Sequence, residues 1–172
     1  MKKIAIIGSG GAGKSTFARQ LSTKLNIEVY HLDAILWKTN WTGTPKDEQK
    51  RIQHELIANE SWIIDGNYGS TLDIRLNAAD TIIFLDIHRL ICLYRAIKRI
   101  LQYRNRTRPD MAEGCEERFD PAFLKWIWKY PQTRRPATIN KLEKLSEEKK
   151  VIILHSPKEV KRFIENLEGE VL

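Results

Sequence analysis

Apolar residues follow two alternating patterns along this chain of 172 residues. Short unbroken apolar runs are typical of strands that are buried on both faces of a parallel sheet. Such runs lie at residues 3–7, 28–32, 61–64, 81–85 and 151–154. Between them, apolar residues recur every three or four positions, which predicts helices at residues 17–25, 46–59, 90–101 and 160–167. The pattern predicts an α/β fold in which helices cover both faces of a five-stranded parallel sheet, in three layers.

The residues after the first apolar run carry a phosphate-binding motif. They read Gly8-Ser9-Gly10-Gly11-Ala12-Gly13-Lys14-Ser15, which fits G-x-x-x-x-G-K-[ST]. A predicted strand precedes the motif and a predicted helix follows it, and this context favours a phosphate-binding loop over a glycine turn that binds nothing. Glycines let successive backbone N–H groups point into one concavity at a helix N-terminus, where anions are favoured.

Three side chains at the end of this motif have expected roles in binding Mg·ATP. The Lys14 ammonium would reach the β- and γ-phosphates and act in catalysis, and the Ser15 hydroxyl would ligate Mg²⁺. Thr16 would add a hydroxyl to the α-phosphate. The expected cofactors are ATP and Mg²⁺, although no base-reading motif in the sequence distinguishes ATP from GTP.

Carboxylates follow three of the predicted strands, at the edge of the sheet where ligands gather. Asp65 suits indirect coordination of Mg²⁺ through water, because its strand is expected beside the first one. Asp33 suits orienting an acceptor hydroxyl or accepting its proton, as phosphoryl transfer requires. Each could instead be a loop or helix cap, and for Asp86 a cap of the next helix is an equally good interpretation.

Seven basic residues lie between residues 89 and 108 without one acidic residue, and they equal the net charge of +7. They are Arg89, Arg95, Lys98, Arg99, Arg104, Arg106 and Arg108. Clustered arginines in a nucleotide-binding protein most often meet phosphate. We expect Arg95, Arg99, Arg106 and Arg108 to belong to a lid that closes over ATP. A solvated basic face and a nucleic-acid surface are the alternatives, and the roles of Arg134 and Arg135 stay open.

Length and composition favour one domain. No apolar segment is long enough to span a membrane, and the first strand begins so early that we expect no signal peptide. Cys92 and Cys115 form no C-x-x-C pair, which fits a reduced, cytoplasmic compartment. His31, His54 and His155 show no metal-ligand spacing, so incidental roles are expected for them. The oligomeric state stays open.

Over nearly its full length the chain resembles the P-loop kinases of the adenylate kinase and shikimate kinase type. More specifically, it resembles the bacterial family of DNA topology modulation proteins related to FlaR. Besides the phosphate loop, the segments that carry this resemblance are His31-Leu32-Asp33-Ala34-Ile35-Leu36-Trp37, Trp62-Ile63-Ile64-Asp65-Gly66-Asn67-Tyr68, Thr71-Leu72-Asp73-Ile74-Arg75-Leu76, Tyr103-Arg104-Asn105-Arg106-Thr107-Arg108-Pro109-Asp110-Met111 and Phe123-Leu124-Lys125-Trp126-Ile127-Trp128. The resemblance implies one kinase-like domain over residues 1–172 with strand order 2-3-1-4-5. It also implies an acceptor-binding segment near residues 34–61, a helical lid near residues 104–135, and adenine contacts from Ser156 and Lys158.

One departure from the kinase pattern concerns the acceptor. Adenylate kinases have Asp-Gly-Phe-Pro-Arg where this chain has Asp65-Gly66-Asn67-Tyr68. The arginine that grips an acceptor phosphate is therefore missing from its usual place, and Arg75 is the candidate to replace it. The residues expected to meet the acceptor are Asp33, Trp37, Gly66, Asn67, Tyr68 and Arg75. The Trp37 and Trp41 rings could stack on a base or sugar, or could pack on the core.

Three functions are compatible with these features. The first is an ATP-dependent phosphotransferase that acts on a small molecule, namely a nucleotide, a nucleoside or another hydroxylated metabolite. The second is an ATP-binding protein associated with nucleic acid or regulation, which the family label suggests but no helix-turn-helix, zinc or RNA-binding signature supports. The third is an NTP hydrolase or a degenerate nucleotide-binding module. A degenerate module is disfavoured because the chain retains Lys14, Ser15, Asp33 and Asp65. The first function is the favoured one, and no membrane partner is expected.

Overall fold

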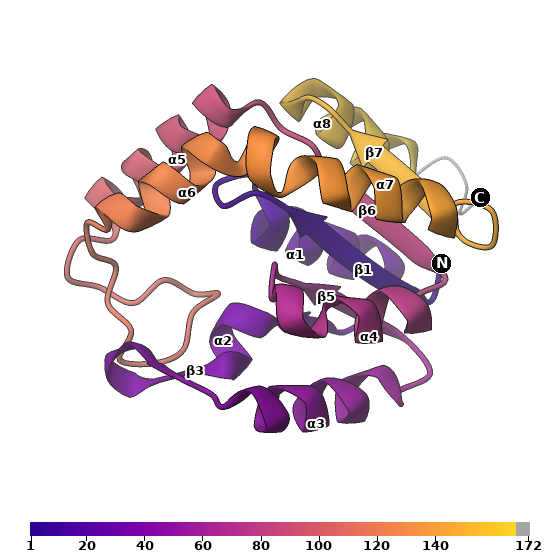
Figure 1. Cartoon of the computed structure of the whole chain (residues 1–172), viewed down its shortest axis with the longest axis horizontal. Coiled ribbons are helices and arrows are strands. Elements are labelled where there is room, and N and C mark those ends of the chain that lie inside the picture. The colour runs from indigo at the N-terminus through magenta and orange to yellow at the C-terminus, as the bar shows by residue number, and fades with distance from the viewer. Residues whose placement is uncertain (168–172) are drawn as a thin grey trace.

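Five parallel strands form the central sheet in the computed structural model, which describes residues 1–167 (Figure 1). They are β1 (Lys3–Gly8), β2 (Val29–His31), β5 (Trp62–Asp65), β6 (Thr81–Leu85) and β7 (Lys150–Leu154). Their order in the sheet is β2-β5-β1-β6-β7. Counted along the chain among these five strands alone, that order is 2-3-1-4-5.

Helices cover both faces of this sheet. They are α1 (Lys14–Leu25), α2 (Leu32–Leu36), α3 (Lys46–Ile57), α4 (Leu72–Ala78), α5 (Arg89–Gln102), α6 (Pro121–Thr133), α7 (Arg135–Leu145) and α8 (Pro157–Asn166). Alternate residues of β1 belong to two separate cores: Ile4 and Ile6 lie in one, and Ala5 and Ile7 in the other. Residues of α1, α5 and α8 complete the first core, and residues of α2, α4 and α7 complete the second. The predicted three-layer α/β fold is confirmed, and no helix within residues 1–167 is long and apolar enough to cross a membrane.

Two excursions from the layers meet beyond the carboxyl ends of the strands. The first is a small hairpin of β3 (Trp37–Lys38) and β4 (Thr42–Gly43), with a 3-10 turn at Thr39–Trp41 between them. The second is the loop over residues 103–120, which descends from the ends of α5 and α6 toward α2 and β3 (Figure 1). The backbone N–H of Asn40 donates to the carbonyl of Gly114 at 3.2 Å, and Trp41 Nε1 donates to the carbonyl of Glu116 at 3.0 Å.

Apolar side chains join the same two excursions. Met111, Ala112 and Cys115 of the loop form a buried cluster, against which Trp37 and Trp41 of the hairpin pack. The part of the expected lid that projects is therefore the loop over residues 103–120. The following helix α6 belongs to the body of the fold, because Ile127 is fully buried in a core.

Candidate active site

The phosphate loop connects β1 to α1 with a backbone conformation that depends on glycine. Gly11 and Gly13 have φ angles of 75° and 94°, which L-residues rarely adopt. A Cβ added to Gly11 would lie 2.1 Å from the carbonyl oxygen of Cys92. No side chain caps the N-terminus of α1 and its first turn holds no acidic residue. Its free N–H groups and the helix dipole therefore favour an anion.

Two cations lie against this loop. Lys14 Nζ donates to the carbonyl of Ser9 at 2.9 Å, and Arg95 Nη1 donates to the carbonyl of Ala12 at 3.2 Å. Burial lowers the pKa of Lys14 although Asp33 and Asp65 act to raise it. A phosphate in the loop would stabilise the charged ammonium and offset this loss of solvation.

Asp65 and Ser15 form a donor set that fits Mg²⁺. Ser15 Oγ donates to Asp65 Oδ2 at 2.8 Å, and Asp65 is 3% exposed. Mg²⁺ prefers oxygen ligands, and it usually retains waters while one or two protein groups and substrate phosphates complete its shell. Among residues 1–167 no group of three or more His, Cys, Asp or Glu side chains is arranged to hold a metal. Ser15 and Asp65 are therefore the residues that would hold Mg²⁺ together with nucleotide.

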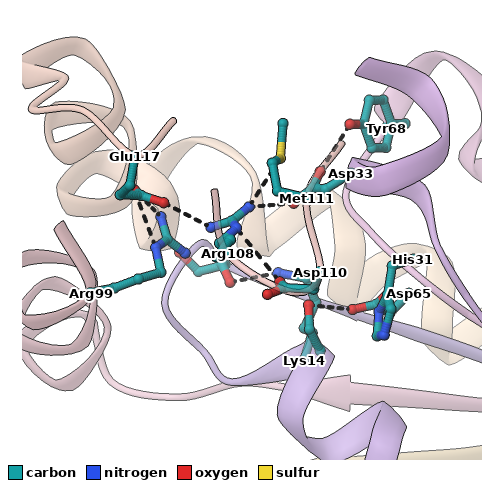
Figure 2. Close-up of polar contacts among 12 residues, drawn as sticks. Lys14, His31, Asp33, Asp65, Tyr68, Arg99, Arg108, Asp110, Met111 and Glu117 are labelled. Carbon is teal, nitrogen blue, oxygen red and sulfur yellow. Dashed lines mark hydrogen bonds and ion pairs between the residues drawn. The ribbon is translucent and has the colours of Figure 1, made fainter. Parts of the chain in front are cut away.

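His31 orients the Asp65 carboxylate, a role that differs from the incidental one expected for it. Its Nδ1 lies 2.7 Å from Asp65 Oδ1 (Figure 2). The strand register explains the contact, because β2 pairs with β5 so that His31 stands opposite Asp65. The position of His31 at the end of a strand beside that of Asp65 was the sequence signal for this contact.

We expect the His31–Asp65 contact to make stability depend on pH. Burial lowers the pKa of His31, but the hydrogen bond and charge of Asp65 together raise it above its usual 6.5. Folding therefore favours the protonated His31 ring. The contribution of the His31–Asp65 contact to the stability of the protein is fully present below pH 6.5, and it is lost as the pH rises through the raised pKa. Urea unfolding of wild type and His31→Gln should give a larger difference in free energy at pH 6 than at pH 8.5. The control is His54→Gln, on the exposed side of α3; a pH-independent difference for His31→Gln would contradict the assignment.

Asp33 stands at the opposite side of the site, at the start of α2. Tyr68 Oη donates to Asp33 Oδ1 at 2.9 Å, and Arg108 Nη2 donates to Asp33 Oδ2 at 3.1 Å (Figure 2). Burial and the adjacent Asp33 charge raise the pKa of Tyr68 far above its usual value, so Tyr68 stays a donor. Asp33 thus presents an oriented carboxylate, 41% exposed, to the cavity.

Two carboxylates of the loop over residues 103–120 pair with Arg99 and Arg108. Arg108 Nη1 lies 3.6 Å from Glu117 Oε2, and Arg108 Nε lies 3.7 Å from Asp110 Oδ2. Arg99 Nε donates to Glu117 Oε1 at 3.3 Å. Neither carboxylate was among the predicted site residues, although both lie just beyond the basic run in the sequence. Figure 2 shows the contacts that join Glu117 to both guanidinium groups.

A cavity of about 1200 Å³ brings these groups together. Its lining includes most of the predicted site residues, namely Gly10, Gly11, Ala12, Gly13, Lys14, Ser15, Thr16, Asp33, Trp37, Asp65, Gly66, Asn67, Tyr68, Arg95, Arg99 and Arg108. Gly8 and Ser9 lie behind it, where the N–H of Gly8 donates to Asn67 Oδ1 at 3.4 Å and Ser9 is buried. Trp41, whose ring was one candidate for stacking on the acceptor, also lines the cavity. Phe123, Trp126 and the α8 residues Pro157 and Val160 line it too but were not predicted to do so.

Arg106 does not face this cavity, contrary to the expectation that it closes over ATP. It is exposed, and its backbone turns back to bond with Tyr103 and Glu117. The turn directs Arg108 inward and Arg106 outward.

Ser156 and Lys158, the residues expected to contact adenine, lie outside the cavity lining. Ser156 Oγ caps α8 by accepting from the N–H of Glu159 at 3.2 Å, and it donates to Glu159 Oε1 at 3.0 Å. Lys158 is exposed. Other residues of α8, namely Pro157, Val160 and Lys161, line the cavity.

Arg75 does not reach the acceptor side, contrary to the role predicted for it. Its side chain is fully buried, and burial lowers its pKa to about 10. Nη2 donates to the carbonyl of Gly66 at 2.7 Å, and Nη1 donates to Gln53 Oε1 at 3.1 Å. Arg75 therefore fixes the position of the Gly66 backbone, directly after the end of β5.

Asp86 does not cap the next helix, α5. It accepts from Arg135 Nε at 2.8 Å and from Nη2 at 2.7 Å, and His155 Nδ1 lies 3.1 Å away. His88 caps α5 instead. Asp86 and Arg135 thus join α7 to the end of β6, whereas Arg134 is exposed.

Comparisons with known proteins concern the fold. No protein-family model and no curated protein matches the chain, so the resemblance to the DNA topology modulation family stays a prediction. Shikimate kinase from Bacteroides thetaiotaomicron is similar with 16% identity and a TM-score of 0.59, over 98% of this chain and 97% of that one. Shikimate kinase from Acinetobacter baumannii in complex with shikimate is similar with 14% identity and a TM-score of 0.61, over 99% and 93%. Deoxyadenosine kinase from M. mycoides with bound dATP is similar with 17% identity and a TM-score of 0.51, over 99% of both chains. The chain has the fold of these P-loop kinases.

Proposed function

We propose that the protein is an ATP-dependent phosphotransferase that transfers the γ-phosphoryl group of Mg·ATP to a hydroxyl of a small molecule. One observation carries the proposal. The phosphate loop, which leads into the uncapped N-terminus of α1, lines the same cavity as the Asp33 carboxylate. Inward-facing arginines lie in that cavity as well. A group that binds phosphate and a group that can orient a hydroxyl are the two parts that phosphoryl transfer needs.

Each part of the site then has a role. The N–H groups of the phosphate loop and Lys14 hold the β- and γ-phosphates, and Ser15 with Asp65 holds Mg²⁺, which supplies charge neutralisation when bound. Arg95, Arg99 and Arg108 stabilise charge that develops on the transferred group.

Asp33 orients the acceptor hydroxyl and accepts its proton. For this, Arg108 has to leave Asp33 and turn to the phosphoryl group, so binding of nucleotide would free the carboxylate. Closure of the loop over residues 103–120 on the hairpin excludes water from the reaction.

The solved kinases of this fold include one bound to shikimate and one bound to dATP. They support a small-molecule acceptor. Three of the seven basic residues between 89 and 108 line the cavity, which favours a phosphate ligand inside it over nucleic acid as the reason for this cluster. Membership of the DNA topology modulation family is a finer proposal that rests on the ordered sequence motifs.

A coupled assay of ADP release tests the proposal. Purified protein with Mg·ATP is offered nucleosides, nucleoside monophosphates and hydroxylated metabolites including shikimate. One acceptor that raises turnover about tenfold over the acceptor-free rate, with a phosphorylated product in the mass spectrum, supports transfer. If no acceptor of the panel is phosphorylated although ATP binds, the proposal is contradicted. DNA binding over a range of salt concentrations then becomes the next measurement.

A further inference from the structure

We infer that the acceptor is an uncharged, ring-bearing hydroxyl compound of the nucleoside class, and that the site rejects acceptors that carry a phosphate or carboxylate. This inference rests on the proposed transferase function. It goes beyond that function because it names the chemical class that the acceptor side can recognise.

The acceptor segment brings no cation to the cavity. The lysines and arginines of residues 34–61 are Lys38, Lys46, Lys50 and Arg51. The structure describes all four, and none of them lines the cavity. Lys38 Nζ lies 3.6 Å from Glu48 Oε2, and Arg51 Nη1 lies 2.6 Å from Glu55 Oε1. Lys46 and Lys50 are exposed on α3. An anionic acceptor group would therefore meet no positive side chain of this segment.

Arg75 cannot supply the missing charge. It is fully buried beneath Gly66, and its guanidinium bonds with Gln53, which is also fully buried, and with backbone carbonyls. Extracting it would leave these buried acceptors without a donor, which is costly.

The lid arginines near Asp33 are already balanced by carboxylates. Arg108 pairs with Asp33, Asp110 and Glu117, and Arg99 pairs with Glu117 as well, so that three carboxylates face two guanidinium groups. This cluster has a net charge of one negative unit. When these arginines turn to ATP, the acceptor side becomes more negative, and a phosphate there would be repelled.

Two further arginines lie at the rim of the cavity. Arg19 is exposed on α1 and its Nη2 donates to Thr16 Oγ1 at 3.5 Å. Arg118 is also exposed, and its guanidinium carbon lies 5.1 Å from the centre of the Trp41 ring. Both are solvated, so they attract an anion weakly.

On the acceptor side, the cavity is lined by aromatic rings and by groups that can bind a hydroxyl. Trp37 and Trp41 meet edge to face at 5.7 Å between ring centres, and both line the cavity with Tyr68. Aromatic faces bind a flat ring by stacking, and the Asp33 carboxylate accepts a hydroxyl proton. A nucleoside offers both a flat base and sugar hydroxyls.

The test compares matched acceptors. Wild-type protein with Mg·ATP is given each common ribonucleoside and deoxynucleoside, the corresponding 5′-monophosphates, and shikimate as a carboxylate-bearing hydroxyl compound. We expect at least one nucleoside to be phosphorylated with a kcat/KM about tenfold or more above that of its own monophosphate and of shikimate. Preferred transfer to a monophosphate or to shikimate would overturn the acceptor class and leave the transferase function standing. Absence of transfer to every compound, with ATP bound, would overturn both.

Variants of tryptophan test the ring contact. Trp37→Ala should raise the KM for the nucleoside about fivefold or more, as loss of a stacking contact does, while the KM for ATP changes less than about twofold. Trp37→Phe should recover most of the affinity. Trp128→Ala is the matched control, because Trp128 is 44% exposed on α6 and lies outside the cavity lining. An unchanged nucleoside KM in a folded Trp37→Ala protein would overturn the stacking contact, and with it the ring-bearing class.

Discussion

Lys14→Ala is expected to lower kcat/KM for phosphoryl transfer by about a hundredfold to a thousandfold. Lys14 Nζ lies within the phosphate loop, 2.9 Å from the carbonyl of Ser9, where a bound phosphate would meet it. The charge acts in a site sheltered from water, so its loss is not replaced by solvent. The rate of ADP release with the best acceptor, measured for variant and wild type in parallel, checks this expectation.

The fold should survive this change. Burial lowers the pKa of Lys14, which means that the protein holds this charge at a cost when no anion is present. We therefore expect the thermal midpoint of the variant without nucleotide to be at least that of wild type, whereas its rise on addition of Mg·ATP should be smaller. Lys125→Ala is the control, since Lys125 is exposed on α6 and outside the cavity lining. A Lys14→Ala protein within about threefold of wild-type turnover would show that the loop is not the site of transfer.

Features with a local pattern could be predicted from the sequence. The strand, the glycine loop and the start of α1 are contiguous over residues 3–25, so no distant contact is needed to recognise them. The parallel sheet then brings Asp33 and Asp65 to one edge, because both follow strands that run in the same direction. This part of the reasoning depends only on strand periodicity and on the direction of the strands.

Contacts between distant segments could not be predicted in this way. Arg75 bonds with Gln53 of α3, and Asp86 bonds with Arg135 of α7, so the partners are 22 and 49 residues apart. The alternation of Arg104, Arg106 and Arg108 gave no sign that a turn would direct only the last one into the cavity. The capping role of Ser156 could have been predicted, however, because Ser156 and Glu159 have the spacing of a capping box.

Asp33→Asn is expected to reduce transfer by about a hundredfold to a thousandfold while leaving ATP binding within about threefold of wild type. An amide of the same shape can still accept from Tyr68 Oη, so the position of the side chain is kept. It cannot accept a proton, and it no longer neutralises Arg108. Transfer is followed by product formation, and ATP binding by titration of the variant without acceptor.

The matched control for this change, Asp47, lies on the acceptor segment that follows Asp33. Asp47→Asn removes an exposed carboxylate from the first turn of α3, outside the cavity lining, and should leave both readouts unchanged. A selective loss of transfer in Asp33→Asn would identify the carboxylate as a group that acts on the acceptor, since Arg108 freed from its partner should bind phosphate at least as well. Full transfer by Asp33→Asn would instead mean that the Asp33–Arg108 pair serves only to hold the loop over residues 103–120 against α2.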